Sequence, residues 1–195
     1  MITTNVLQRT FHVKYGNATG TCFTVDVNSR QYLVTARHVV DGIQQQDTID
    51  LYHEQTWEPL RTTVAWISQT EEDIAILVPE VQLSPAYPLE PNAGGLLIGQ
   101  DVYFCGYPYR LRTEAGSLNR GFPIPLVKKG IVSSLVIEKN CHIIIIDGHN
   151  NPGFSGGPVV FARPGSLDYK VAGVISAYKV QYEPILLKGG GRHGP

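Results

Sequence analysis

Residues 150–160 read NNPGFSGGPVV, and this stretch decides how the rest of the chain is interpreted. One serine, Ser155, stands among three glycines and two prolines, and apolar β-branched residues follow directly. Such clusters between regular elements are most often plain turns. Alternatively, Gly153 and Gly156 permit unusual backbone angles, so that N–H groups and the Ser155 hydroxyl converge on one point. This second interpretation requires a base and an acid elsewhere in the chain.

The composition excludes several classes of partner. Among 195 residues, 17 acidic and 16 basic side chains nearly balance, which gives no electrostatic footprint for nucleic acid or an anionic membrane. The N-terminal segment lacks a secretory signal, and no apolar run approaches the ~20 residues that span a bilayer. We therefore expect a cytoplasmic protein without membrane insertion. Three cysteines without C-x-x-C spacing indicate reduced thiols, and no metal or organic cofactor is expected.

Short β-rich segments bounded by turn residues recur along the chain, whereas helical periodicity is scarce. The pattern predicts an all-β protein. The expected strands are Thr21–Val27, Gln31–Thr35, Leu60–Ile67, Ile74–Val78, Asp101–Phe104, Lys129–Val136, His142–Asp147, Pro158–Phe161 and Tyr169–Ala177.

Residues 79–95, PEVQLSPAYPLEPNAGG, contain four prolines that break any regular element. Each half of the chain has several short strands, the pattern of a barrel or sandwich, and a cleft between two such bodies is a natural binding site. We predict an N-terminal barrel over residues 1–80, a linker over 81–98, a C-terminal barrel over 99–187 and a tail over 188–195.

Serine is a poor nucleophile until a base takes its proton, and imidazole suits this role because its pKa lies near neutrality. His38 follows the apolar segment QYLVTA, so the end of a strand would hold its ring. The other histidines, His12, His53, His142 and His193, are expected to be surface or satisfied packing residues.

The third group must be a carboxylate that orients the imidazole. Asp73 is the best candidate because it immediately precedes the buried-looking strand IAILV. Its alternative interpretation is a solvated acidic turn shared with Glu71 and Glu72. Asp147 is a possible pocket residue close to Ser155.

Three motifs now stand in order: LVTARHV at 33–39, EEDIAIL at 71–77 and NPGFSGGPV at 151–159. They resemble the active-site blocks of chymotrypsin-fold serine proteases, most closely the bacterial Deg or high-temperature-requirement type. Intermediate segments are similar too: VYFCGYP at 102–108, GIVSSL at 130–135 and VAGVISA at 171–177. The resemblance spans about residues 20–180.

The resemblance implies two antiparallel Greek-key β-barrels with the active site in the cleft between them. It implies a serine endopeptidase that acts on polypeptides through an acyl-enzyme, with His38 as the general base, Asp73 as its orienter and Ser155 as the nucleophile. The backbone N–H groups of Gly153 and Ser155 would form the oxyanion hole.

The specificity pocket implied by the resemblance has no acidic residue at its base. Its expected lining comes from two segments: His149, Asn150, Asn151, Ser176, Ala177 and Tyr178. His149 would favour polar or acidic P1 side chains, whereas a bulky Tyr178 would favour small aliphatic ones, and both alternatives stay open.

Two positions depart from the family pattern. Arg37 stands where a small residue is usual, so it needs solvent or an acid such as Asp41 or Asp147. Phe154 replaces the Asp that pairs with a new N-terminus in zymogen-type relatives, which predicts that this activation switch is absent.

Two other functions are alternatives to the protease. Gly-x-Ser-x-Gly also marks the nucleophile elbow of α/β-hydrolases, but that fold needs a helix after the serine and a downstream histidine, and the only one is His193 in the tail. A two-barrel scaffold that binds peptides without turnover is the second alternative. The sequence predicts neither the oligomeric state nor the natural substrate.

Overall fold

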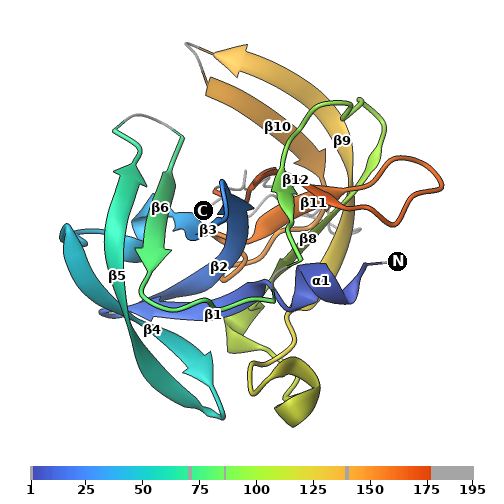
Figure 1. Cartoon of the computed structure of the whole chain (residues 1–195). Helices are drawn as coiled ribbons and strands as arrows, with labels where there is room; N and C mark the ends of the chain where they lie inside the picture. Colours follow the sequence, from blue (N-terminus) through green and yellow to red (C-terminus); the bar gives the residue numbers. More distant parts are fainter. Residues whose placement is uncertain (1, 70–71, 86, 139–140, 177–195) are drawn as a thin grey trace, which may run out of the picture.

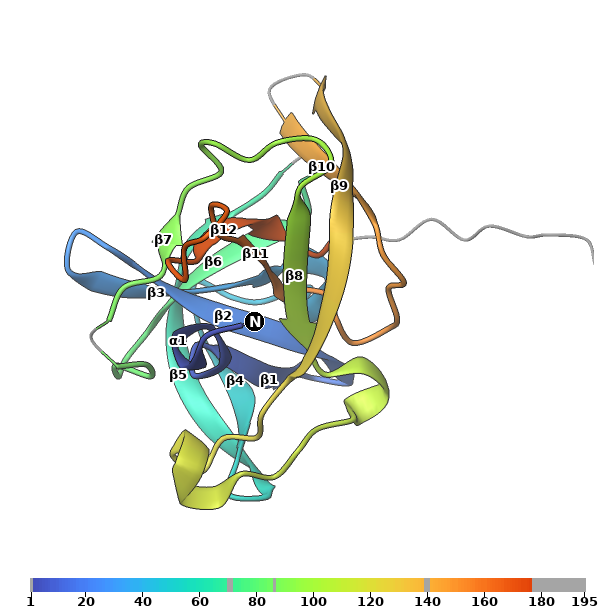
Figure 2. The same ribbon diagram turned by 90° about the vertical axis from the view of Figure 1, so that its right-hand side faces the viewer.

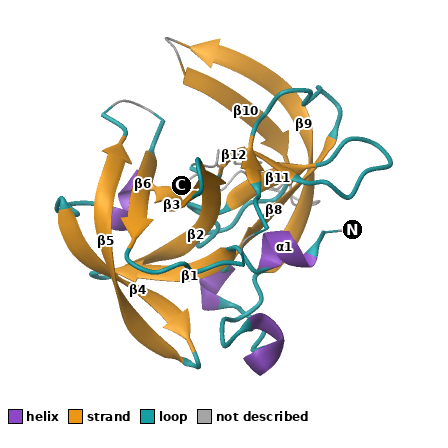
Figure 3. Ribbon diagram, viewed as in Figure 1, coloured by secondary structure: helices purple, strands orange, loops and turns teal. Residues whose placement is uncertain are grey.

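The computed structural model describes residues 2–69, 72–85, 87–138 and 141–176. Nearly all regular structure is β, and the helices are single turns (Figure 3). The two halves of the chain form two separate sheets that pack together (Figure 1).

The first half is a closed barrel with strand order β1-β2-β3-β6-β5-β4. A short helix, α1 (Thr4–Leu7), precedes it, and a 3-10 turn, η1 (Arg37–Val40), follows β3. The strands are β1 (Thr10–Tyr15), β2 (Ala18–Val27), β3 (Arg30–Ala36), β4 (Gln46–His53), β5 (Thr56–Ile67) and β6 (Ile74–Pro79).

Local sequence explains much of this barrel. Strands β2 and β3 are joined by Asn28 and Ser29, both with positive φ (49° and 60°), the backbone of a two-residue hairpin turn. Contact between β1 and β4, for example Val13 opposite Leu51, closes the barrel and removes its free edges. Apolar side chains from all six strands fill the interior.

The second half is a six-stranded sheet of order β10-β9-β8-β11-β12-β7, which curls into a half-barrel. In Figure 2, β8 and β9 lie side by side next to the loop of residues 107–125. That loop contains two 3-10 turns, η2 (Pro108–Arg110) and η3 (Gly116–Asn119). The strands are β7 (Glu90–Pro91), β8 (Asp101–Gly106), β9 (Leu126–Glu138), β10 (Cys141–Asp147), β11 (Pro158–Phe161) and β12 (Lys170–Val174).

The predicted fold class is confirmed: the architecture is all-β and consistent with the two-barrel, chymotrypsin-like fold. One detail differs, because the second sheet is open between β10 and β7 over the described residues. All nine predicted strands overlap observed ones, although β12 ends at Val174, before the predicted end. β1, β4 and β7 were not predicted, and the last predicted strand ends at Ala177, which lies outside the described residues. The limits assigned to the domains stay a prediction.

An apolar interface joins the two halves. Phe23 and Val34 from the first barrel share one cluster of buried side chains with Cys105 and Val160 from the second sheet. The second sheet also has its own core, in which Phe104 and Phe154 meet edge to face with ring centroids 5.1 Å apart. The loops that connect the strands are therefore placed by two packed bodies.

A buried cation fixes the segment between the halves. Arg9 is fully buried and pairs with Asp26 at 2.5 Å. Its guanidinium also donates to the carbonyl oxygens of Pro85 (2.8 Å) and Tyr87 (2.6 Å). The proline-rich connection thus lies against the first barrel, because a buried guanidinium needs these acceptors.

Candidate active site

The end of β3 positions His38. The strand stops at Ala36, and the next four residues form η1, in which Val39 and Val40 are buried while the His38 side chain stays 51% exposed. The buried valines anchor the turn, and the imidazole therefore stands at the surface of the first barrel.

Asp73 holds this imidazole. Its Oδ2 lies 2.7 Å from His38 Nδ1, and its Oδ1 accepts the His38 backbone N–H at 3.0 Å. The Asp73 carbonyl also accepts the Arg37 N–H at 2.9 Å. Asp73 has a φ of 51°, a left-handed conformation that aspartate tolerates better than most residues. These three hydrogen bonds hold Asp73 in this conformation, and its carboxylate is paired with the imidazole while its side chain is 19% exposed.

The Ser155 turn lies directly on the first barrel. The Ser155 carbonyl accepts the N–H of Thr21 in β2 at 2.8 Å. Gly156 has a φ of +84°, and a Cβ there would overlap Thr21 O and lie 2.8 Å from Ala36 N. Only glycine permits this approach, which brings the serine backbone next to the residues that lead into η1. Among the described residues, no hydrogen bond joins Ser155 Oγ to His38; such bonds are often long without substrate.

Two backbone amides at this turn have no acceptor. Neither Gly153 N–H nor Ser155 N–H donates a hydrogen bond within the described part of the chain. Gly153 has a φ of +106°, and a Cβ there would overlap the Tyr107 carbonyl. Thr21 Oγ1 donates to Gly153 O at 2.7 Å and accepts the Tyr107 N–H at 3.2 Å. Unpaired, fixed amides of this kind can stabilise a developing oxyanion.

The predicted pocket residues are only partly brought together. His149, Asn150 and Asn151 lie in the loop before Ser155, and Asn151 Nδ2 is 3.1 Å from His149 Nε2. Ser176 follows β12, whose continuation is held to the Ser155 turn because Gly156 N–H donates to Ile175 O at 2.7 Å. Ala177 and Tyr178 lie outside the described residues. Asp147 is exposed at the end of β10.

Both departures from the family pattern have a structural account. Arg37 Nη1 donates to the Ser68 carbonyl at 3.1 Å, a partner that the sequence did not indicate. The pKa of the nearby Glu72 is lowered by its hydrogen bond from Ser68 and, to a smaller extent, by the Arg37 charge. Phe154 is fully buried in the core of the second sheet, where it packs on Phe104.

Two buried cysteines and one buried histidine are unsuited to chemistry. Burial raises the pKa of the Cys22 thiol well above its usual value and that of Cys105 to about 12, so neither is a thiolate at neutral pH. His12 is buried, and neither of its ring nitrogens has a hydrogen-bond partner among the described residues, so the expectation of a surface or satisfied packing residue is wrong for it. Burial and then the charges of Arg112 and Arg110 lower the His12 pKa to about 4.

Three residues that contribute to the site were missed from the sequence. Thr21 bridges Gly153 to Tyr107, as described above. Lys128 and Tyr109 contact the loop before Ser155. All three are distant from Ser155 in the chain, and each lies in an ordinary strand or turn pattern. Their proximity to the site is therefore visible only in the three-dimensional structure.

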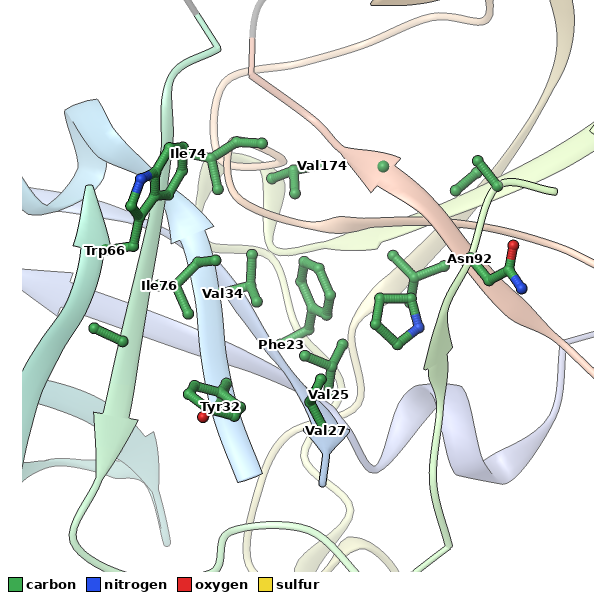
Figure 4. Close-up of a pocket in the computed structure, with 16 residues that line it drawn as sticks. Phe23, Val25, Val27, Tyr32, Val34, Trp66, Ile74, Ile76, Asn92 and Val174 are labelled. Carbon is green, nitrogen blue, oxygen red and sulfur yellow. The ribbon is translucent and has the colours of Figure 1, made fainter. Parts of the chain in front are cut away.

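A groove away from the candidate active site carries none of the candidate catalytic groups. This groove of about 500 Å³ lies between the outer face of the first barrel and β12 (Figure 4). Phe23, Val34 and Val174 line it, and Trp66 and Asn92 lie at its rim. None of the described residues that line it is charged. Within the described ranges, no three His, Cys, Asp or Glu side chains gather as a metal site would require, and no helix is long and apolar enough to cross a membrane.

The fold and this site define a class: two packed β bodies with a histidine–carboxylate pair on one and a glycine-flanked serine on the other. The structure also excludes the α/β-hydrolase elbow, because the residues after Ser155 form strand β11 and not a helix. The model of the trypsin-like peptidase domain family matches residues 19–167, and the chain belongs to this family. No curated protein matches the chain.

Proposed function

We propose that the chain is a serine endopeptidase that uses Ser155, His38 and Asp73. The observation that carries this proposal is the hydrogen bond between His38 Nδ1 and Asp73 Oδ2, next to a serine turn with two unpaired amides. Membership of the peptidase family supports it.

In this mechanism, Ser155 Oγ attacks the peptide carbonyl while His38 Nε2 takes its proton. The new C–O bond turns the carbonyl into an oxyanion, which accepts hydrogen bonds from Gly153 N–H and Ser155 N–H. Asp73 holds the tautomer that leaves Nε2 free and stabilises the imidazolium. His38 then protonates the leaving amine, the C–N bond breaks, and water hydrolyses the acyl-enzyme by the same groups.

The substrate would bind as an extended strand beside residues 174–176, a common mode of peptide recognition. That segment is fixed, because Ile175 N–H donates to Gly157 O at 2.9 Å. The kinship to Deg-type proteases is part of the proposal, and both alternatives for the P1 side chain are kept. The cytoplasmic location stays a prediction.

A fluorophosphonate probe tests the nucleophile. The wild type should be labelled, and Ser155→Ala should not, with equal thermal unfolding of both proteins. Cleavage of an unfolded protein substrate at internal bonds, read by mass spectrometry, tests the endopeptidase activity. Labelling of Ser155→Ala at the wild-type rate would reject the mechanism.

A binding module without turnover is the second candidate. The observation that favours it is the missing hydrogen bond between Ser155 Oγ and His38 within the described residues. A folded wild type that binds peptides, stays unlabelled and cleaves nothing would establish this alternative.

A further inference from the structure

The orientation of one peptide bond decides whether Gly153 N–H can face a substrate carbonyl. The C=O and N–H of the Pro152–Gly153 peptide point in opposite directions, because the peptide unit is planar and trans. The Pro152 carbonyl accepts the Tyr109 N–H at 3.0 Å. This bond turns the carbonyl toward Tyr109 and leaves the Gly153 amide on the opposite side.

The segment that leads to this peptide has few fixed points. Residues 148–151 belong to no strand, and the Asn151 N–H donates only locally, to Asn150 Oδ1 at 2.8 Å. Phe154 N–H donates to Asn151 O at 3.3 Å, which is a contact inside the turn itself. The position of the segment therefore depends on side chains from elsewhere.

Lys128 supplies the side-chain hydrogen bonds that hold this segment. Its Nζ donates to the His149 carbonyl at 2.8 Å and to Asn151 Oδ1, and lies 5.2 Å from the centre of the Phe154 ring. The Asn151 amide in turn donates to the Tyr109 hydroxyl at 3.2 Å. One ammonium thus contacts residues 149, 151 and 154, and through Asn151 it is linked to Tyr109.

The strand pattern explains why a lysine can act here. In β9, Lys128 lies opposite Phe104 and is half-buried, whereas its neighbours Val127 and Lys129 are exposed. A lysine on the inner face of a strand needs acceptors, and only neutral oxygens and a ring are supplied. Within the described residues, Lys128 has no carboxylate partner, so its hydrogen-bonding capacity goes to the loop.

Tyr109 is held in an unusual conformation. Its φ is 52° and that of Arg110 is 62°, a left-handed backbone that non-glycine residues rarely adopt. Such strain persists only where surrounding contacts determine it. The bonds of Tyr109 to Pro152 and Asn151 are two of these contacts.

We propose that Lys128 is a positioning residue that holds the 149–151 segment so that Gly153 N–H stays directed at the carbonyl under attack. This inference rests on the proposed function. Among the described residues Lys128 makes no hydrogen bond to Ser155, and it acts through the loop.

The test compares three variants. Lys128→Met removes the donors at nearly equal length, Lys128→Arg keeps donors, and Lys129→Met is the matched control, since Lys129 pairs with Asp101 on the surface at 2.7 Å. After titration of active sites with the fluorophosphonate, Lys128→Met should lower kcat by about ten- to a hundredfold with KM changed less than about threefold. Lys128→Arg should restore most of kcat, and Lys129→Met should match the wild type.

Hydrogen exchange supplies a readout that does not require turnover. The Asn151 and Phe154 amides, which are the ones in this loop that donate hydrogen bonds within the described residues, should exchange faster in Lys128→Met, with unchanged exchange in the first barrel. A kcat per titrated site within about twofold of the wild type, or unchanged exchange in this loop, would overturn the proposal. If Lys128→Met does not fold, Asn151→Ala removes the same hydrogen bond from the other side and is judged in the same way.

The two proposals fail differently. A wild type that the fluorophosphonate does not label, and that cleaves nothing, refutes the serine endopeptidase. Faster exchange of the loop in Lys128→Met would then still establish the attachment by Lys128, whereas labelling with unchanged kcat in the variant refutes Lys128 alone.

Discussion

The substitution Thr21→Val tests whether a single hydroxyl joins the two halves at the candidate site. Thr21 is fully buried in β2, and valine keeps its β-branched shape. The hydroxyl donates to Gly153 O at 2.7 Å and accepts the Tyr107 N–H at 3.2 Å. Valine therefore leaves one part-buried carbonyl and one buried N–H without a partner.

Each unpaired buried group costs about 1–3 kcal/mol, and the methyl group that replaces the hydroxyl offsets part of this. We expect the free energy of unfolding to fall by about 2–4 kcal/mol in total. With an m-value of about 2 kcal/mol per molar urea, the midpoint of unfolding should move down by about 1–2 M. Urea titrations followed by tryptophan fluorescence measure this shift.

Thr19→Val is the matched control for this measurement. Thr19 lies in the same strand, is half-buried, and its hydroxyl makes no hydrogen bond within the described part of the chain. Its urea midpoint should stay close to that of the wild type. Equal midpoints for Thr21→Val and Thr19→Val would refute the idea that the Thr21 hydroxyl stabilises the contact between the halves.

Three further predictions concern charge. Asp73→Asn should lower kcat by about 10⁴-fold, measured per titrated site, because the asparagine amide no longer holds the required tautomer of His38; a loss of less than about tenfold would contradict this role. Arg9→Met should lower the free energy of unfolding by about 3–5 kcal/mol, and adding Asp26→Asn should recover part of it, because the single change leaves the part-buried Asp26 carboxylate without its ion-pair partner. No recovery in urea titrations of the double variant would contradict the pairing. For His12, the folded pKa of about 4 lies below the ordinary 6.5, so as the pH falls from 6.5 to 4 the unfolded state gains a proton first and stability is lost. His12→Phe should remove about 3 kcal/mol of this loss between pH 6.5 and 4. If the free energy of unfolding from urea titrations falls equally in the wild type and His12→Phe between these pH values, the effect is excluded.

The sequence predicts the strands that are rich in apolar residues and bounded by turn residues. β3 and β6 are apolar runs between polar turns, and β11 follows the glycine-rich turn directly. β4 was missed because its sequence, QDTIDLYH, places polar side chains on the outer face and leaves only a few buried positions. β7 is a two-residue pairing inside the proline-rich segment, and its partner β12 lies far along the chain.

The sequence predicts those candidate site residues that lie next to a recognisable strand or turn. Asp73 was selected because it precedes a buried strand, and the structure places it on His38. Thr21 and Lys128 are not predictable in this way, because their roles depend on hydrogen bonds to a loop more than twenty positions away in the chain. The sequence around a threonine or a lysine does not indicate which distant residue its side chain contacts.

The close approach of Gly156 to Ala36 has a consequence for any attempt to divide the protein. The backbone around Ser155 is held in its conformation by contacts with the first barrel. If the chain were cut between β6 and β8, each fragment would lack the half of the protein that it packs against at this contact. On the proposed function, recovery of fluorophosphonate labelling on mixing the fragments would report their reassembly.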